Sequence, residues 1–134
     1  MNAAVHPREV LYKGDKPFPI LPAVDHYAGS EKLMRKALAL QAELGSIFDV
    51  TCDCEDGAAA GNEVEHRKLC ASVIAGEDNR YNRVGVRIHD VTHAQWKADM
   101  EVLVGEAGDR LAFITLPKAR SADDVRTQLD WLRT

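Results

Sequence analysis

A cluster of acidic residues closed by a glycine is the part of this sequence whose residue types could carry chemistry. The cluster reads Asp53-Cys54-Glu55-Asp56-Gly57 and follows directly on the β-rich stretch 47–52. Side chains alternate along a strand, so Thr51, Asp53 and Glu55 are expected on one face, with the acids gathered at one end. Carboxylates held close together repel one another and are costly to desolvate. A site that needs negative charge, for a divalent metal or a cationic partner, therefore explains the cluster better than a solvated surface does.

Four segments of the chain have the pattern of a strand followed by a helix. The strands are expected over 18–24, 47–55, 83–90 and 111–116, and residues 25–29 are expected to form a loop. The helices are expected to follow N-cap residues at Ser30, Asn62, Thr92 and Ser121. Apolar residues at helical spacing predict the buried faces, namely Leu33, Ala37, Leu40 and Leu44, then Val64, Leu69, Val73 and Ile74, then Trp96, Met100, Leu103 and Val104, then Val125, Leu129 and Leu132.

Short connections between these units require successive strands to run parallel, joined by right-handed crossovers. Either an open doubly wound sheet or part of a (β/α)8 barrel satisfies that requirement. No G-x-G-x-x-G sequence or P-loop follows any strand, and eight units typically take about 250 residues, so four units in 134 residues fit half a barrel. We expect an α/β fold, a (β/α)8 TIM barrel of which this chain supplies the first four units, with residues 1–16 as an N-terminal extension and 17–134 as the half barrel.

Composition excludes several classes of protein. The chain is 46% hydrophobic and 28% charged, which is typical of a globular domain, and its net charge of -4 argues against binding to nucleic acid. It has no apolar run of about 20 residues and no secretion signal, so no contact with a membrane is expected. Three cysteines without a C-x-x-C pair indicate a reduced, cytoplasmic compartment.

Charged residues recur where the predicted strands end, which is the edge where barrel enzymes place their chemistry. They are Asp25, Glu55 with Asp56, Arg87 with His89, and Lys118. These residues form either a functional site or a set of salt bridges that ties the loops together. Cys52 and Cys54 with His66 or His93 could form a metal site, but cysteines alternating on the strand face opposite the acids are typical of packing.

Several of these segments together resemble one family. They are Leu21-Pro22-Ala23, Asp53-Cys54-Glu55-Asp56-Gly57-Ala58, Arg67-Lys68, Gly85-Val86-Arg87-Ile88, and Leu116-Pro117-Lys118 followed by Ser121 and Asp124. In this order and spacing, over residues 18–133, the chain resembles the HpcH/HpaI aldolase and citrate lyase β-subunit family, which includes malyl-CoA lyases. The acidic block is the most specific part of the resemblance.

The resemblance implies a TIM barrel of the phosphoenolpyruvate-binding type that cleaves or forms a carbon–carbon bond beside Mg²⁺. It implies that the substrate is a small β-hydroxy acid or its CoA thioester, and that the protein is a homo-oligomer. Arg87 matches the arginine that holds the substrate carboxylate, and Glu55 and Asp56 match the acidic pair near the metal, so catalysis is expected to rest on these three. Lys118 and Asp25 are expected to contact the substrate, with a structural salt bridge as the alternative for Lys118.

The chain also departs from the family pattern. The direct metal ligands are a Glu and an Asp after the fifth and sixth strands, beyond Thr134, so this chain alone is expected to be inactive. His89 stands where Asn is common, and His26 with Tyr27 differs from the commoner citrate lyase sequence. Two alternatives stay open: a non-catalytic half barrel that binds or assembles with a partner, and a class II pyruvate aldolase that acts on free acids.

Overall fold

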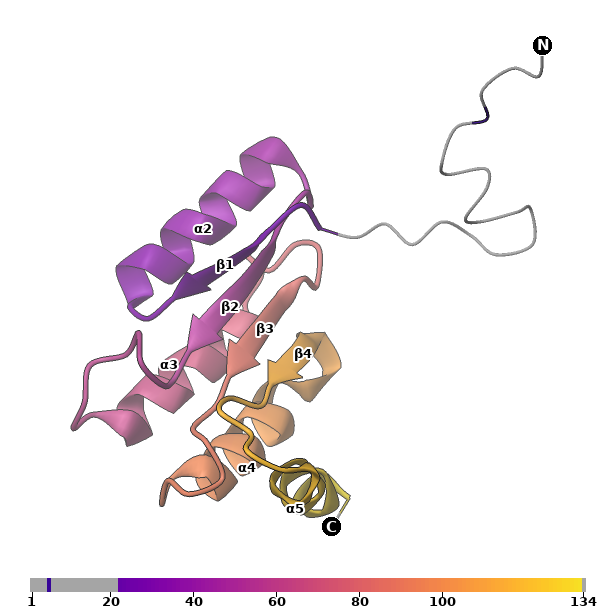
Figure 1. The fold of residues 1–134 in the computed structure, drawn as a ribbon. Helices are drawn as coiled ribbons and strands as arrows, with labels where there is room; N and C mark the ends of the chain where they lie inside the picture. Colours follow the sequence, from indigo (N-terminus) through magenta and orange to yellow (C-terminus); the bar gives the residue numbers. More distant parts are fainter. Residues whose placement is uncertain (1–4, 6–21, 134) are drawn as a thin grey trace.

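Strands and helices alternate along the chain in the computed structural model, which describes residue 5 and residues 22–133. The described strands are β1 (Asp25–Ala28), β2 (Asp49–Asp53), β3 (Val84–Arg87) and β4 (Leu111–Thr115). The helices that follow them are α2 (Glu31–Leu44), α3 (Glu63–Ala75), α4 (Trp96–Ala107) and α5 (Ala122–Leu132), with a 3-10 turn η1 (Gly108–Arg110) before β4. Figure 1 shows the four strands side by side and pointing the same way.

The order of the strands decides between the two architectures. The strands pair in parallel in the sequential order β1-β2-β3-β4. A doubly wound sheet reverses its strand order so that helices cover both faces, whereas sequential right-handed crossovers place successive helices side by side on one face. Here α2 contacts α3, and α3 contacts α4. The α/β fold built from four units of a (β/α)8 barrel is therefore confirmed.

The two faces of the sheet differ in character. Val50 and Cys52 of β2, with Val84 and Val86 of β3, are fully buried in the apolar layer beneath the helices. The other face is polar and carries an ordered series of contacts along β2. At its start, Asp49 accepts a hydrogen bond from Arg83 Nε at 2.6 Å, and in its middle the Thr51 hydroxyl bonds Asp25 at 2.8 Å.

On the polar face of the sheet, the Phe113 ring occupies the space that a side chain at Gly85 would fill. A Cβ atom added to Gly85 would lie 2.3 Å from the Phe113 ring, so only glycine leaves room for Phe113 on this face. The β3–β4 register shifts between Val84 and Val86, and the shift brings Arg87 level with Thr115. A bulge of this kind re-aims the residues that follow it.

The first strand corrects the sequence-based prediction. Most of the strand expected over 18–24 lies outside the described residues, as does the expected extension 1–16 apart from Val5, and the described residues 22–24 are not in a strand. Residues 25–28, expected to be a loop, form β1 instead, in register with β2 from Asp25 opposite Asp49. Asp25 therefore begins its strand, and its expected position at the carboxyl end is wrong.

The helices are where expected, but some of their faces are not. Helix α2 buries Met34, Ala37, Leu38 and Gln41, so the face expected at Leu33, Leu40 and Leu44 was one residue out of phase. Val64, Val104, Leu129 and Leu132 are also exposed. The third helix starts at Trp96, because Thr92 donates its N–H and hydroxyl to Asp90 in a turn, and Gly105 lies inside the helix. Of the expected capping boxes, only that of Ser121 with Asp124 forms.

No described helix is long and apolar enough to cross a membrane.

Candidate functional site

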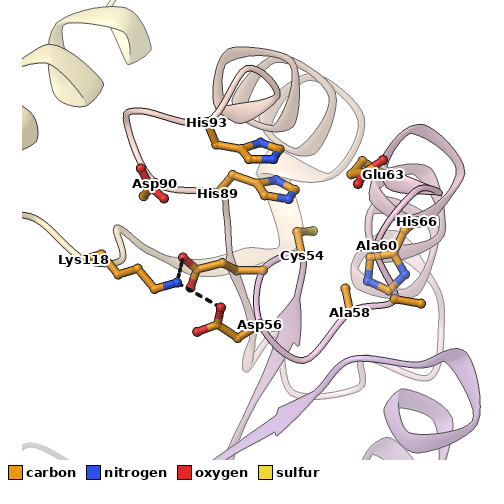
Figure 2. Close-up of a pocket in the computed structure, with 12 residues that line it drawn as sticks. Cys54, Asp56, Ala58, Ala60, Glu63, His66, His89, Asp90, His93 and Lys118 are labelled. Atoms are coloured by element: carbon orange, nitrogen blue, oxygen red, sulfur yellow. Dashed lines mark hydrogen bonds and ion pairs between the residues drawn. The ribbon is translucent and has the colours of Figure 1, made fainter.

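A cavity of about 240 Å³ opens at the carboxyl ends of the strands, between the loops that follow β2 and β3. Glu55, His89 and Lys118 are among its lining residues, and they come from three different βα connections. Figure 2 shows His89 and Lys118 at this cavity. Lys118 Nζ lies 2.9 Å from Glu55 Oε1 and 2.9 Å from Asp56 Oδ1. The loops after β2 and β4 are therefore joined by charge at the edge where barrel enzymes bind substrates.

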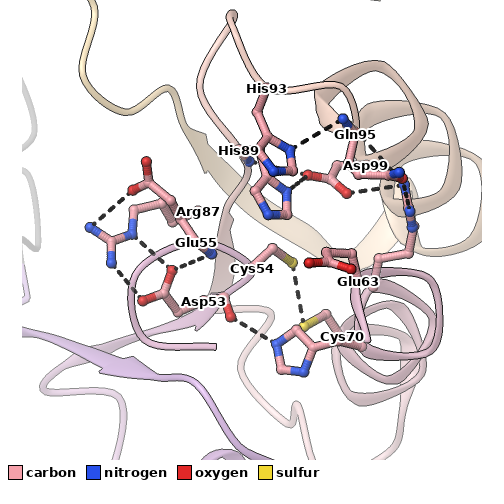
Figure 3. Close-up of polar contacts among 12 residues, drawn as sticks. Asp53, Cys54, Glu55, Glu63, Cys70, Arg87, His89, His93, Gln95 and Asp99 are labelled. Atoms are coloured by element: carbon pink, nitrogen blue, oxygen red, sulfur yellow. Dashed lines mark hydrogen bonds and ion pairs between the residues drawn. The ribbon is translucent and has the colours of Figure 1, made fainter. Parts of the chain in front are cut away.

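The central polar contact of this edge is a two-point ion pair. Arg87 Nε donates to Asp53 Oδ1 at 2.8 Å, and Arg87 Nη2 donates to Asp53 Oδ2 at 2.6 Å (Figure 3). The two residues are register partners at the ends of β2 and β3, so the sheet itself sets their alignment. Arg87 Nη1 lies 3.5 Å from Glu55 Oε2, and the guanidinium stands 5.0 Å from the centre of the Tyr27 ring. Its orientation is therefore fixed from three sides.

The Asp53 carboxylate is held by the loop that follows it as well as by Arg87. It accepts the backbone N–H of Glu55 at 3.0 Å and that of Gly57 at 2.9 Å. Burial on its own would raise the pKa of Asp53, but the bonds from Arg87 and from these two N–H groups outweigh it and lower the pKa. Asp53 thus stays ionised, with four donors around its two oxygens.

Two glycines permit the close packing of the loops beneath this pair. A Cβ atom on Gly57 would lie 2.3 Å from Asp53 Oδ2, and one on Gly29 would lie 1.7 Å from the Gly57 carbonyl oxygen. Neither position has room for any side chain. The glycine that closes the acidic cluster is therefore required so that the backbone can reach Asp53.

Glu55 is the buried member of the acidic pair. Its side chain is 7% exposed, whereas that of Asp56 is 61% exposed. Both Glu55 oxygens lie within ion-pair distance of a cation, yet neither makes an aligned hydrogen bond with any described residue. The hydrogen bond of Lys118 to Asp56 and its ion pair with Glu55 raise the pKa of Lys118. The backbone of Lys118 is in the left-handed region at φ 51°. A non-glycine residue pays strain for that conformation, as residues at functional sites often do.

The structure brings together four of the five residues predicted from the sequence. Glu55 contacts Arg87 and Lys118, and Asp56 contacts Lys118. Asp25 is not among them, because it lies at the opposite end of its strand and accepts the Thr51 hydroxyl. Asp53, the main partner of Arg87, was missed as a site residue. The sequence pattern did place Asp53 in the acidic cluster, on the strand face of Thr51 and Glu55, but the predicted strands ran past Asp53 and past Arg87, whereas β2 and β3 end at these two residues.

The geometry agrees with a comparison against solved structures. A citrate lyase from Burkholderia xenovorans LB400, known from a crystal structure at 2.24 Å resolution, matches with 52% sequence identity and a TM-score of 0.81. The chain belongs to the family of that citrate lyase. The match covers 84% of this chain and 35% of the Burkholderia citrate lyase, so this chain spans about a third of the length of that enzyme. No family model and no curated protein matches this chain.

Two cysteines and a histidine of this chain form a second cluster behind the acidic loop. Ligand atoms of Cys54, His66 and Cys70 lie within 4.8 Å of one another. His66 Nε2 faces the Asp53 carbonyl oxygen at 2.8 Å, and a carbonyl only accepts, so that nitrogen carries a proton. The bond between Cys54 and Cys70, together with burial, raises the pKa of Cys54. Cys54 and Cys70 are both buried and their sulfur atoms lie 3.7 Å apart, which is typical of packed thiols.

A buried charge network lies on the helix side of the same edge. His89 Nδ1 is 2.6 Å from Asp99 Oδ2 (Figure 3). Arg67 Nη1 is 3.2 Å from Asp99 Oδ1. The strand predicted over 83–90 would place His89 two residues after Arg87 on the same face, and this prediction is wrong because β3 ends at Arg87. The ring instead turns toward α4, where it stacks on His93 with the ring centres 4.0 Å apart.

Proposed function

We propose that this chain provides the substrate-orienting part of a Mg²⁺-dependent carbon–carbon lyase that acts on a β-hydroxy acid or its CoA thioester. The observation that carries the proposal is the guanidinium of Arg87, held by Asp53 at the carboxyl edge of the sheet. Kinship with a citrate lyase supports the reaction class, and a cytoplasmic homo-oligomer fits the same proposal.

The contacts of Arg87 leave one edge of its guanidinium for a substrate. The edge formed by Nε and Nη2 is occupied by Asp53, and Glu55 lies beside Nη1. The outer edge, formed by Nη1 and the second hydrogen of Nη2, keeps the planar two-point geometry that matches a carboxylate. A substrate carboxylate or thioester oxygen bound there would gain stabilisation as charge develops on it during bond cleavage.

The acidic residues of the rim fit a magnesium ion. Mg²⁺ prefers carboxylate oxygens and keeps several of its waters, and the buried Glu55 oxygens are acceptors without an aligned donor among the described residues. Glu55 and the exposed Asp56 would hold such waters, while the direct ligands would lie beyond Thr134. When bound, the ion would supply stabilisation of the enolate that C–C cleavage releases. Lys118, between the two acids, would balance their charge.

The proposal is tested by assaying the full-length protein for release of a carbonyl product. We expect cleavage of malyl-CoA or of the corresponding free acid, loss of the activity on chelation, and its return with Mg²⁺. Cleavage of malyl-CoA would assign a malyl-CoA lyase-like substrate, and release of pyruvate from a free hydroxy-oxo acid would assign an aldolase of the pyruvate class. An absence of Mg²⁺-dependent cleavage across β-hydroxy acids and their thioesters would refute the lyase and favour a non-catalytic binding role.

A further inference from the structure

His89 and Asp99 form a buried pair that the proposed site does not yet use. The His89 side chain is 10% exposed and that of Asp99 is fully buried. Asp99 Oδ2 accepts both the backbone N–H of His89, at 3.1 Å, and the ring Nδ1–H, at 2.6 Å. An acidic side chain that accepts from an imidazole at Nδ1 fixes the tautomer of the neutral ring, so that Nε2 is the nitrogen that can take a proton, which is the arrangement that makes histidine a base.

The charge of Asp99 is balanced without any need for His89 to be a cation. The Arg67 guanidinium is 3% exposed and lies 3.2 Å from Asp99 Oδ1, and Gln95 accepts a hydrogen bond from Arg67 on its far side. Because a buried carboxylate needs a compensating charge, Arg67 supplies from α3 what a protonated His89 would otherwise have to supply. Neutral His89 is then compatible with the pair.

The remaining nitrogen of His89 is available to the cavity. His89 lines the cavity together with Glu55 and Lys118, and its Nε2 makes no hydrogen bond with any described residue (Figure 2). The His93 ring is stacked on it with an interplanar angle of 10°, which prevents the ring from tilting. The titratable and charged groups that face His89 from the helices and around the cavity are Asp99, Arg67, His93, Glu63, His66, Cys54, Glu55, Asp56, Asp90 and Lys118.

We propose that His89 is a catalytic proton carrier and that Asp99 is its positioning residue. The inference rests on the proposed lyase function. During cleavage, Nε2 takes the proton of the substrate's β-hydroxyl, the O–H electrons form the carbonyl, and the electrons of the broken C–C bond pass to the enolate. The same proton then returns from Nε2 to the enolate carbon, which completes the acid or acyl product and restores neutral His89.

His89→Asn is the sharpest variant, because its side-chain N–H can still donate to Asp99 while the base is removed. His26→Gln is the matched control, since His26 is an exposed histidine of the same sheet that has no hydrogen-bond partner among the described residues. Both are made in the full-length enzyme.

We expect His89→Asn to lower kcat by about 10²- to 10⁴-fold with little change in KM, the range of general acid–base catalysis, and His26→Gln to leave both within twofold. The acidic limb of the kcat–pH profile should disappear in His89→Asn. In deuterium oxide, wild type should exchange the methyl hydrogens of the product acid or acyl-CoA, and the variant should not. If His89→Asn folds and cleaves as fast as wild type, the proton-carrier role is overturned while the lyase assignment stands; if wild type itself cleaves nothing, both fall.

Nitrogen NMR of the imidazole provides a readout that does not require activity. In wild type at neutral pH we expect Nδ1 of His89 to carry the proton and Nε2 to be bare, and this signature to be lost in Asp99→Asn together with most of kcat. A His89 ring protonated at Nε2 in wild type, or an unchanged tautomer in a folded Asp99→Asn protein, overturns the role of the pair. Circular dichroism establishes that each variant is folded, and if His89→Asn is not, His89→Gln takes its place.

Discussion

Asp53→Asn is the substitution that tests most directly whether the carboxylate of Asp53 aims Arg87. Four N–H groups converge on the two oxygens of Asp53, and the asparagine amide keeps only one oxygen. The amide NH₂ would then face two donors, and Arg87 would lose its counter-charge. Breaking a buried ion pair from one side costs about 3–5 kcal/mol, and because Arg87 is 22% exposed we expect the lower end, about 3 kcal/mol.

Asp49→Asn is the matched control for this change. Asp49 lies on the same strand and the same face, also pairs with an arginine, and is at the opposite end of the sheet, where Arg83 Nε donates at 2.6 Å. Its side chain is 15% exposed and has this single charged partner, so we expect a loss of about 1 kcal/mol. Urea unfolding followed by circular dichroism measures both losses.

The functional prediction for the same pair of variants differs in kind. Asp53→Asn should lower kcat/KM of the full-length enzyme by at least about tenfold, because a misaligned guanidinium loses roughly 1.4 kcal/mol or more of transition-state binding. Asp49→Asn should leave kcat/KM nearly unchanged once the protein is folded. Equal effects of the two substitutions on stability and activity would refute the reasoning, since they would make Asp53 one more structural acid.

Three further outcomes follow from the same geometry. Arg87→Lys in the full-length enzyme should cost about 2–4 kcal/mol in kcat/KM, because an ammonium cannot reproduce the planar fork, whereas Arg83→Lys should not. Gly57→Ala should lower the free energy of unfolding by about 1–3 kcal/mol by displacing the Asp53 carboxylate, whereas Gly105→Ala, with open space at its Cβ inside α4, should raise it by roughly 0.5–1 kcal/mol, both in chemical denaturation. Because the pKa of Asp53 is lowered in the folded state, its contribution to the free energy of unfolding is present above about pH 3.9, the unfolded value, and is lost as pH falls through the folded pKa. The difference in free energy of unfolding between wild type and Asp53→Asn should therefore be constant at neutral pH and vanish in acid. A difference that vanishes already above pH 5 would contradict this.

The parts of the fold that are predictable from sequence are those in which local chemistry and tertiary packing agree. The alternation around Cys52 and Val86 places these residues beneath the helices, and Ser121 caps the helix that it precedes. Strand β1 was missed because Asp25 and Gly29, which bound the segment, are residues that strands disfavour, and residues 25–28 become a strand only by pairing with β2. That pairing is a tertiary effect which composition within a four-residue window does not carry.

The candidate site was predicted in its residues more than in its connections. Arg87 and Glu55 were expected at one edge, and they lie there, but the acid that grips Arg87 is Asp53. The two-point contact depends on the β2–β3 register, which sequence leaves undetermined to within a residue. The position of His89 was predicted wrongly for a related reason. Side chains alternate between the two faces only as far as the last paired residue of a strand, and β3 ends at Arg87.

The contact between Gly29 and Gly57 divides the edge of the sheet into a fixed half and an adaptable half. A single methyl group at either position would collide with backbone or with Asp53, so the loops after β1 and β2 have little freedom to accept new side chains there. The connections after β3 and β4 contain no such glycine contact, and Asp90 is partly exposed and Lys118 is exposed. A library meant to change which acid this scaffold accepts should therefore vary the latter two connections and leave the former pair untouched.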